Sequence, residues 1–265
     1  MKWTDEAESA LKKVPFFVRK KVRARVEKEA AEENKTCITL AEVKATQNRF
    51  LSKMDSDIRG YQIETCFGQN GCPNRCVSGD TLLNRLENLF NEEDLLTFLK
   101  KNVKGNLKYH HEFRVGIAEC PNACSQPQIR DIAIIGASVP MVTDTTCSLC
   151  NACVELCKES SIRLDEDDER AEIDYDTCVR CGACIKVCPT GTIVCRESGY
   201  RVQLGGRLGR HPRLAKELDG LFSEDQVLET VKNCITFYKQ NSTNGQRFSQ
   251  LFDDKTLLGY FLNPD

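Results

Sequence analysis

Two short runs of cysteines carry the clearest chemical signal in this chain of 265 residues. CSLCNACVELC occupies residues 147–157 and CVRCGACIKVC occupies residues 178–188, and both have the spacing CxxCxxCxxxC. Cysteine thiolates at such intervals bind either zinc or an iron–sulfur cluster. Zinc sites do not need a third and a fourth cysteine at this spacing, whereas a [4Fe–4S] cube takes four thiolates. The spacing therefore favours iron–sulfur clusters, and two structural zinc sites are the alternative.

Together the two runs resemble the two-cluster bacterial ferredoxins. In that family three cysteines of one run hold one cube, and the fourth reaches across to the other cube. The resemblance implies two [4Fe–4S] clusters, one held by Cys147, Cys150, Cys153 and Cys188 and the other by Cys178, Cys181, Cys184 and Cys157. Small residues in the loops, Ala152, Gly182 and Ala183, leave room for a cube and free backbone N–H groups to bond its sulfurs.

Of the 16 cysteines, eight lie outside these runs, and four of the eight stand in two compact motifs. CFGQNGC spans residues 66–72, CPNAC spans residues 120–124, and the glycine- and arginine-rich GGRLGRHPR follows at residues 205–213. These motifs resemble the siroheme and [4Fe–4S] half of the sulfite and nitrite reductases, in their small single-repeat form. The resemblance implies a third cube, held by Cys66, Cys72, Cys120 and Cys124, and a siroheme whose iron is also ligated by Cys124.

Siroheme carries several ring carboxylates, so the resemblance also implies cations and N–H donors that hold it. The predicted cofactor-binding residues are Asn122, Arg207, Arg210 and Arg213. Six basic side chains are candidates for contact with the substrate anion, and none of them is preferred: Arg75, Lys108, His110, His111, Arg114 and Arg130.

Cys76 ends the stretch CPNRC at residues 72–76, which nearly repeats CPNAC. Two interpretations are open: Cys76 replaces one of the two upstream cysteines as a ligand, or it is a free thiol beside them. Cys195 and Cys234 occur in apolar patterns and are predicted to be core residues.

The motifs are predicted to stand on an α+β fold. Strands are expected over residues 113–118 and 131–136, on either side of CPNAC, and over residues 200–206. A helix pair is expected over residues 81–90 and 91–101, with Asn91 as N-cap of its second member. Ser223 is predicted to start a long amphipathic helix that runs through Tyr238.

The first 52 residues predict a small helical domain. Thr4 is a plausible cap of a first helix, Pro15 suits the start of a second, and Thr39 and Glu42 form a capping box for a third that runs toward Phe50. Trp3 with TDEA after it, and the stretch VPFFVRKKVRARVE, resemble the small helical domain of a protochlorophyllide reductase subunit. The basic side chains of the second helix form either a solvated face or a docking surface.

Beyond this domain, residues 53–140 and 197–265 are predicted to form a reductase half-domain, interrupted at residues 141–196 by an inserted ferredoxin-like domain. A net charge of −2 argues against a nucleic-acid binder. With a mean hydropathy of −0.42 and no long apolar run, a membrane span is not expected. Because the first residues lack the apolar core of a signal peptide, we expect a cytoplasmic protein with reduced thiols.

The resemblance implies an oxidoreductase that reduces sulfite to sulfide with six electrons, which pass through the two ferredoxin-type clusters to the siroheme-coupled cluster. Nitrite is the alternative substrate. A non-catalytic iron–sulfur subunit of a larger redox complex is the alternative function. The implied partners are a reduced ferredoxin or another low-potential donor. The resemblance covers one of the two related halves of the large family members, so either a second copy or a redox complex is expected to complete the pocket, or the chain's own basic residues take over.

Overall fold

The computed structural model describes residues 1–252, apart from the side chains of residues 52–56 and 69. The last part of the predicted half-domain, residues 253–265, lies outside the described residues. The chain divides into two compact units: Met1–Ile58 with Val103–His110, and Arg59–Asn102 with the chain from His111 onward. Within the described residues no helix is long and apolar enough to cross a bilayer.

The first unit is built on three helices, α1 (Asp5–Lys12), α2 (Phe16–Glu32) and α3 (Leu40–Asp57), and on a short parallel pairing of β1 (Lys2–Trp3) with β2 (Cys37–Ile38). Thr4 caps α1, Pro15 precedes α2, and Thr39 and Glu42 form the capping box of α3, so the three predicted helix starts are confirmed. The third helix continues past Phe50. The apolar faces bury a small core of Ala7, Val26, Ala30, Ile38 and Val43.

Glu29 joins α2 to α3 through its carboxylate. The carboxylate accepts hydrogen bonds from Thr46 Oγ1 at 2.7 Å, from Arg49 Nη2 at 2.8 Å and from Arg25 Nε at 2.9 Å. Burial alone would raise the pKa of Glu29, but these hydrogen bonds lower it to about 2. Its contribution to stability is therefore present above the unfolded pKa of about 4.3 and is lost as the pH falls toward 2.

A Glu29→Gln variant is expected to destabilise this unit by about 1–2 kcal/mol at neutral pH, because the buried Thr46 hydroxyl and two guanidinium groups lose a charged acceptor. In the full-length chain, hydrogen exchange of the amides of α2 and α3 should accelerate about tenfold. Glu32→Gln is the matched control, because Glu32 lies on the same helix, is exposed, and is 4.0 Å from Lys28 Nζ. Equal acceleration in both variants would contradict the role given to Glu29.

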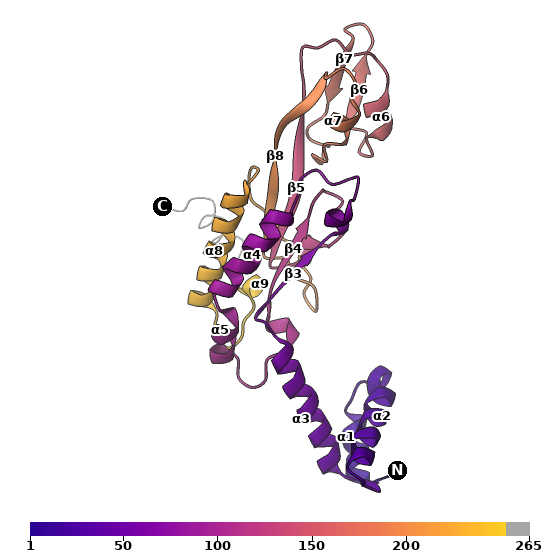
Figure 1. The fold of residues 1–265 in the computed structure, drawn as a ribbon, viewed down its shortest axis with the longest axis vertical. Helices are drawn as coiled ribbons and strands as arrows, with labels where there is room; N and C mark the ends of the chain where they lie inside the picture. Colours follow the sequence, from indigo (N-terminus) through magenta and orange to yellow (C-terminus); the bar gives the residue numbers. More distant parts are fainter. Residues whose placement is uncertain (253–265) are drawn as a thin grey trace. The chain divides into compact units, whose positions relative to one another are not determined.

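The second unit is organised by a five-stranded sheet in the order β3-β4-β5-β8-β9 (Figure 1). Its strands are β3 (Tyr61–Thr65), β4 (Phe113–Ala118), β5 (Ile132–Val142), β8 (Ile193–Leu204) and β9 (Lys216–Glu217). The first three are parallel, and β8 pairs antiparallel with both β5 and β9. The predicted strands are therefore confirmed over residues 113–118, 132–136 and 200–204, within β4, β5 and β8, whereas residues 131, 205 and 206 lie outside them.

Four helices accompany this sheet: α4 (Asp80–Glu92), α5 (Leu95–Asn102), α8 (Glu224–Asn241) and α9 (Phe248–Leu251). Short 3₁₀ turns occur at Phe67–Asn70, Tyr109–His111 and Pro127–Ile129. Phe113 of β4 ties sheet to helices, because its ring centroid lies 5.8 Å from that of Phe90, 5.5 Å from Tyr238 and 5.2 Å from Phe248. Ser223 forms the N-terminal capping box of α8 with Gln226, as predicted for its start.

Two local predictions were wrong. Asn91 lies inside α4, where its Oδ1 accepts a hydrogen bond from Tyr61, and Asp94 takes over the cap by accepting from the Thr97 amide. Cys195 is exposed, as are the next three residues of β8, so this stretch of the strand is uncovered, whereas Cys234 is fully buried as predicted.

Residues 143–192 connect β5 to β8 and are called the insert below. The two strands pair from Ile132 opposite Leu204 to Val142 opposite Ile193, so the insert leaves and re-enters the sheet at one place (Figure 1). It contains two short helices, α6 (Ala152–Leu156) and α7 (Ala183–Val187), and an antiparallel hairpin of β6 (Ile162–Asp165) and β7 (Arg170–Ile173). Its small core consists of Cys153, Ile162, Ala171 and Cys184, together with Ile193 at the start of β8.

Candidate metal centres

CFGQNGC (residues 66–72) and CPNAC (residues 120–124) meet at one edge of the sheet. Parallel β3 and β4 are in register, with Thr65 opposite Ile117, so their carboxyl ends lie side by side. Cys66 follows β3 directly, and its amide donates to the Ile117 carbonyl at 3.1 Å. Cys120 follows β4 after one intervening residue. Crevices outside the carboxyl ends of strands are where open α/β sheets bind ligands.

The four ligands predicted in these two motifs are close enough for their charges to interact: Cys66, Cys72, Cys120 and Cys124. Burial is the largest cause that raises the pKa of Cys120, and the thiols of Cys66, Cys124 and Cys72 add to it. Cys66 Sγ accepts the amide of Gly68 at 3.4 Å, and Cys124 Sγ accepts Asn122 Nδ2 at 3.0 Å. Cys124 is exposed, whereas Cys120 is buried. This group of four thiols, called the core set below, is therefore open on the Cys124 side.

Glu119 organises the core set, although nothing in the sequence singled it out. Its side chain is buried, its Oε1 accepts the Gly79 amide at 2.8 Å, and its own amide donates to Cys66 Sγ at 3.3 Å. A Cβ at Gly68 would lie 1.8 Å from Glu119 Oε2, and a Cβ at Gly136 would lie 2.7 Å from the Glu119 carbonyl oxygen. Gly68 therefore leaves room for the Glu119 carboxylate, and Gly136 leaves room for the Glu119 backbone.

Cys76 differs in its hydrogen bonding from the predicted ligands. Its Sγ donates to the Glu119 carbonyl at 3.2 Å, and its amide donates to the same oxygen at 2.9 Å. Burial raises the pKa of the Cys76 thiol to about 12, with smaller contributions from Cys120 and Cys181. A thiol that donates a hydrogen bond is protonated, whereas metal ligation requires a thiolate.

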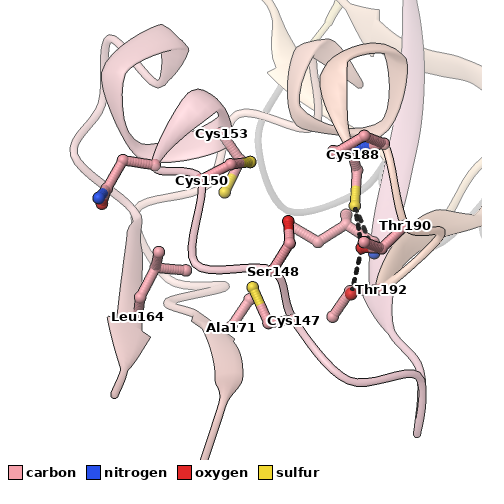
Figure 2. Close-up of a pocket in the computed structure, with 12 residues that line it drawn as sticks. Cys147, Ser148, Cys150, Cys153, Leu164, Ala171, Cys188, Thr190 and Thr192 are labelled. Atoms are coloured by element: carbon pink, nitrogen blue, oxygen red, sulfur yellow. Dashed lines mark hydrogen bonds between the residues drawn. The ribbon is translucent and has the colours of Figure 1, made fainter.

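The first run of the insert surrounds a pocket together with one cysteine of the second run. Figure 2 shows Cys147, Cys150 and Cys153 around this pocket, with Cys188 entering from the other run. Cys188 Sγ accepts the Ile193 amide at 3.3 Å and lies 3.6 Å from Thr190 Oγ1. Burial alone would raise the pKa of Cys188, but these hydrogen bonds leave it below its ordinary value. This group is called the outer insert set.

The second run gathers the complementary group. Burial raises the pKa of Cys178, and the neighbouring thiols of Cys181 and Cys157 add to the effect. Cys184 is buried, and the thiols of Cys181 and Cys178 again contribute after burial to a pKa of about 12. This group of four is called the inner insert set. Cys188 thus lies beside the first run and Cys157 acts on Cys178 of the second run, and the exchange of one ligand between the runs stays a prediction.

The donor set suits clusters better than single ions. Within the described part of the chain, no three His, Cys, Asp or Glu side chains converge as ligands of one metal ion. The outer insert set instead surrounds an open pocket, and backbone amides point at several sulfurs, including Cys147 and Cys157. Amide hydrogen bonds to sulfur are among the factors that tune iron–sulfur clusters. The residues present therefore fit the implied cubes.

Comparison with known proteins identifies the larger unit. The family model for the nitrite and sulphite reductase 4Fe-4S domain matches residues 61–257. This chain belongs to the nitrite and sulphite reductase family. A coenzyme F420-dependent sulfite reductase from Methanocaldococcus jannaschii is 37% identical over 154 residues, which cover 57% of this chain and 24% of that protein.

A solved dissimilatory sulfite reductase I has the same fold over 76% of this chain and 51% of its own, with a TM-score of 0.53 and 17% identity. The mixed α/β fold therefore resembles sulfite reductase structures. The chain spans about a quarter of the curated sulfite reductase and about half of the solved one.

The N-terminal segment has a separate resemblance. The family model for the proto-chlorophyllide reductase 57 kD subunit matches residues 3–46. A light-independent protochlorophyllide reductase subunit from Chlorobium limicola is 64% identical over 39 residues, which are 15% of this chain and 7% of that protein.

In this reductase-family unit, two of the arginines predicted to hold siroheme bind backbone carbonyls. Arg213 donates to Gly205 at 2.9 Å and to Phe252 at 3.0 Å, and Arg207 donates to His211 at 2.8 Å. Arg210 is exposed. Arg207 and Arg213 thus brace the loop that carries them, and contact with siroheme stays a prediction for all three.

The six substrate candidates are divided between the two units. Lys108 and His110 belong to the first unit, and the other four belong to the second. Arg130 pairs with Glu64, and Arg75 Nη1 lies 3.9 Å from Glu119 Oε2, beside the core set. The Arg114 amide donates to the buried Asp131 at 2.9 Å. Among the six, Arg75 is therefore tied by a described contact to a residue of the candidate centre.

Proposed function

We propose that this chain is a siroheme-dependent sulfite reductase with a built-in pair of ferredoxin-type clusters. The observation that carries the proposal is the meeting of CFGQNGC and CPNAC at the carboxyl ends of β3 and β4, where the core set lies. Membership of the nitrite and sulphite reductase family supports it. The proposed domains are residues 1–52, residues 53–140 with 197–265, and the inserted residues 141–196.

In this proposal Cys66, Cys72, Cys120 and Cys124 hold one cube, and the exposed Cys124 also ligates siroheme. The cofactors, when bound, would supply the redox chemistry that converts sulfite to sulfide, which consumes six electrons and six protons and releases the three oxygen atoms as water. Asn122 orients Cys124 through its hydrogen bond at 3.0 Å. Arg75 is linked to these groups through Glu119, whose Oε2 lies 3.9 Å from Arg75 Nη1. Cys76 stays a protonated thiol outside the ligand set.

Electrons are proposed to come from a reduced ferredoxin or another low-potential donor and to pass through the two insert sets. Each electron that leaves the donor oxidises it by one unit and reduces the receiving centre by one unit. Thiolates must stay reduced for this chemistry, which favours the cytoplasm. We propose that a second copy or a redox complex completes the substrate pocket.

The decisive test is anaerobic purification followed by metal analysis, an absorption spectrum and assays with sulfite and nitrite. Three cubes and one siroheme predict about thirteen iron atoms per chain and a chlorin-like band. Sulfide formation from sulfite is the expected activity. About twelve iron atoms without that band would overturn the enzyme assignment and favour an electron-transfer subunit. Faster reduction of nitrite than of sulfite would overturn the choice of substrate.

A further inference from the structure

The insert contacts the sheet through its second cysteine run. Lys186 of α7 donates its Nζ to the carbonyls of Arg75 at 2.6 Å and Pro73 at 3.1 Å, both in the loop between Cys72 and Cys76. The Ser138 amide of β5 donates to the Arg180 carbonyl at 2.8 Å, and Ser138 forms an isolated bridge with Cys181. Two separate elements outside the insert, the loop between Cys72 and Cys76 and strand β5, therefore contact the second cysteine run.

The two runs are copies in backbone but not in side chains. Asn151 and Gly182 occupy equivalent positions with φ of 59° and 67°, so both loops make the same left-handed turn. A Cβ at Gly182 would lie 2.8 Å from Ser138 Cβ, whereas Asn151 is exposed. Asparagine tolerates this conformation, so the space beside β5, rather than the turn, explains the glycine.

A second difference follows the same asymmetry. The position of Lys186 in the second run is occupied in the first run by Glu155, which is exposed. Glu155 could not donate to backbone carbonyls, because an ionised carboxylate is only an acceptor. Gly182 in place of Asn151 and Lys186 in place of Glu155 therefore both lie where the second run contacts β5 and the loop between Cys72 and Cys76.

Strand β5 connects the core set to the inner insert set over a short distance. Gly136 is packed against the Glu119 carbonyl, next to Cys120, and Ser138 is packed against the loop of Cys181. Two residues of a strand span about 7 Å. Cys76 lies close to both sets, because the charges of Cys120 and Cys181 both contribute to the raised pKa of its thiol.

We propose that Lys186, Gly182 and Ser138 are positioning residues that seat the inner insert set beside the core set and thereby fix the order of the centres in the relay. The inference rests on the proposed function. With clusters bound, Cys178, Cys181, Cys184 and Cys157 would hold the centre next to the core set, so that an electron would pass through it to reach the core centre. Each such transfer would oxidise one centre and reduce the next by one electron, with no bond made or broken.

The test compares four variants of the full-length protein loaded with its clusters. Lys186→Met removes the donor, and Gly182→Asn places a side chain against β5. Their matched controls are Glu155→Gln and Asn151→Gly, at the equivalent positions of the other run. Iron is counted in each sample, and electron paramagnetic resonance then measures the magnetic interaction between the core set and the inner insert set. Single-turnover reduction of the core centre gives the transfer rate.

Lys186→Met and Gly182→Asn are expected to keep their iron, to weaken this magnetic interaction, and to slow the transfer about tenfold, since small displacements of reacting centres are costly. Both controls should match the native protein. Native interaction and rate in both test variants, or equal losses in the controls, would overturn the inference. The proposed function fails separately, through a native protein that lacks the siroheme band or does not reduce sulfite.

Discussion

A Cys124→Ser variant is expected to lose or displace the siroheme band and to lose more than about 100-fold in sulfite reduction. Loss of outer-shell partners alone costs up to that factor at metal centres. The physical reason is position: Cys124 is the exposed member of the core set, and Asn122 already donates to its sulfur at 3.0 Å. An absorption spectrum of the anaerobically purified variant, with an assay of sulfide release, measures both effects.

Cys76→Ser is the matched control, because Cys76 lies in the near-repeat of the same motif. Its thiol donates to the Glu119 carbonyl, and a serine hydroxyl can donate in the same way. The variant should therefore keep the native spectrum and the native iron content. If Cys124→Ser kept the band while Cys76→Ser lost it, the proposed ligand set would have to exchange these two residues.

Motif spacing and local caps could be predicted from the sequence because both depend on neighbours along the chain. Thr4, Thr39 and Ser223 each cap a helix whose first turn follows them directly. The strands around CPNAC were recognisable because β4 and β5 are buried almost throughout, and buried strands have continuous apolar sequences.

Residues that act across the fold were not predictable. Glu119, Ser138 and Lys186 are ordinary polar residues in the sequence, and each gains its role from a partner about 40 or more residues away. The register of parallel β3 and β4 and the length of β5 decide those partners. Asn91 shows the same limit locally: it has the right chemistry for a cap, but α4 continues through it.

A Glu119→Ala variant is expected to lose the core set's cube and siroheme while it keeps the two insert clusters. Alanine would leave the buried Gly79 amide without its acceptor, which costs about 1–3 kcal/mol, and would open a cavity under the ligand loop. Iron should fall from about thirteen to about eight atoms per chain, and the chlorin-like band should disappear. Full iron content in this variant would show that the cysteines alone organise the loop.

Glu119→Gln separates the support that this side chain gives from its charge. Glutamine can still accept from Gly79 and fill the same space, so the cube and the band should remain. Glu119 Oε2 is buried, accepts no hydrogen bond from the described residues, and has Arg75 Nη1 3.9 Å away. A buried carboxylate oxygen without a hydrogen-bond partner is a cost to folding.

The compensating benefit is expected in the redox chemistry of the core set. A negative charge beside a cluster disfavours the addition of an electron, and net charge is one of the factors that set cluster potentials. Glu119→Gln should therefore raise the reduction potential of the core cube in a spectroscopic titration, while the insert clusters keep theirs. A potential unchanged or lowered in Glu119→Gln would mean that the carboxylate serves the loop alone. A raised potential would show that the Glu119 carboxylate lowers the reduction potential of the proposed core cube.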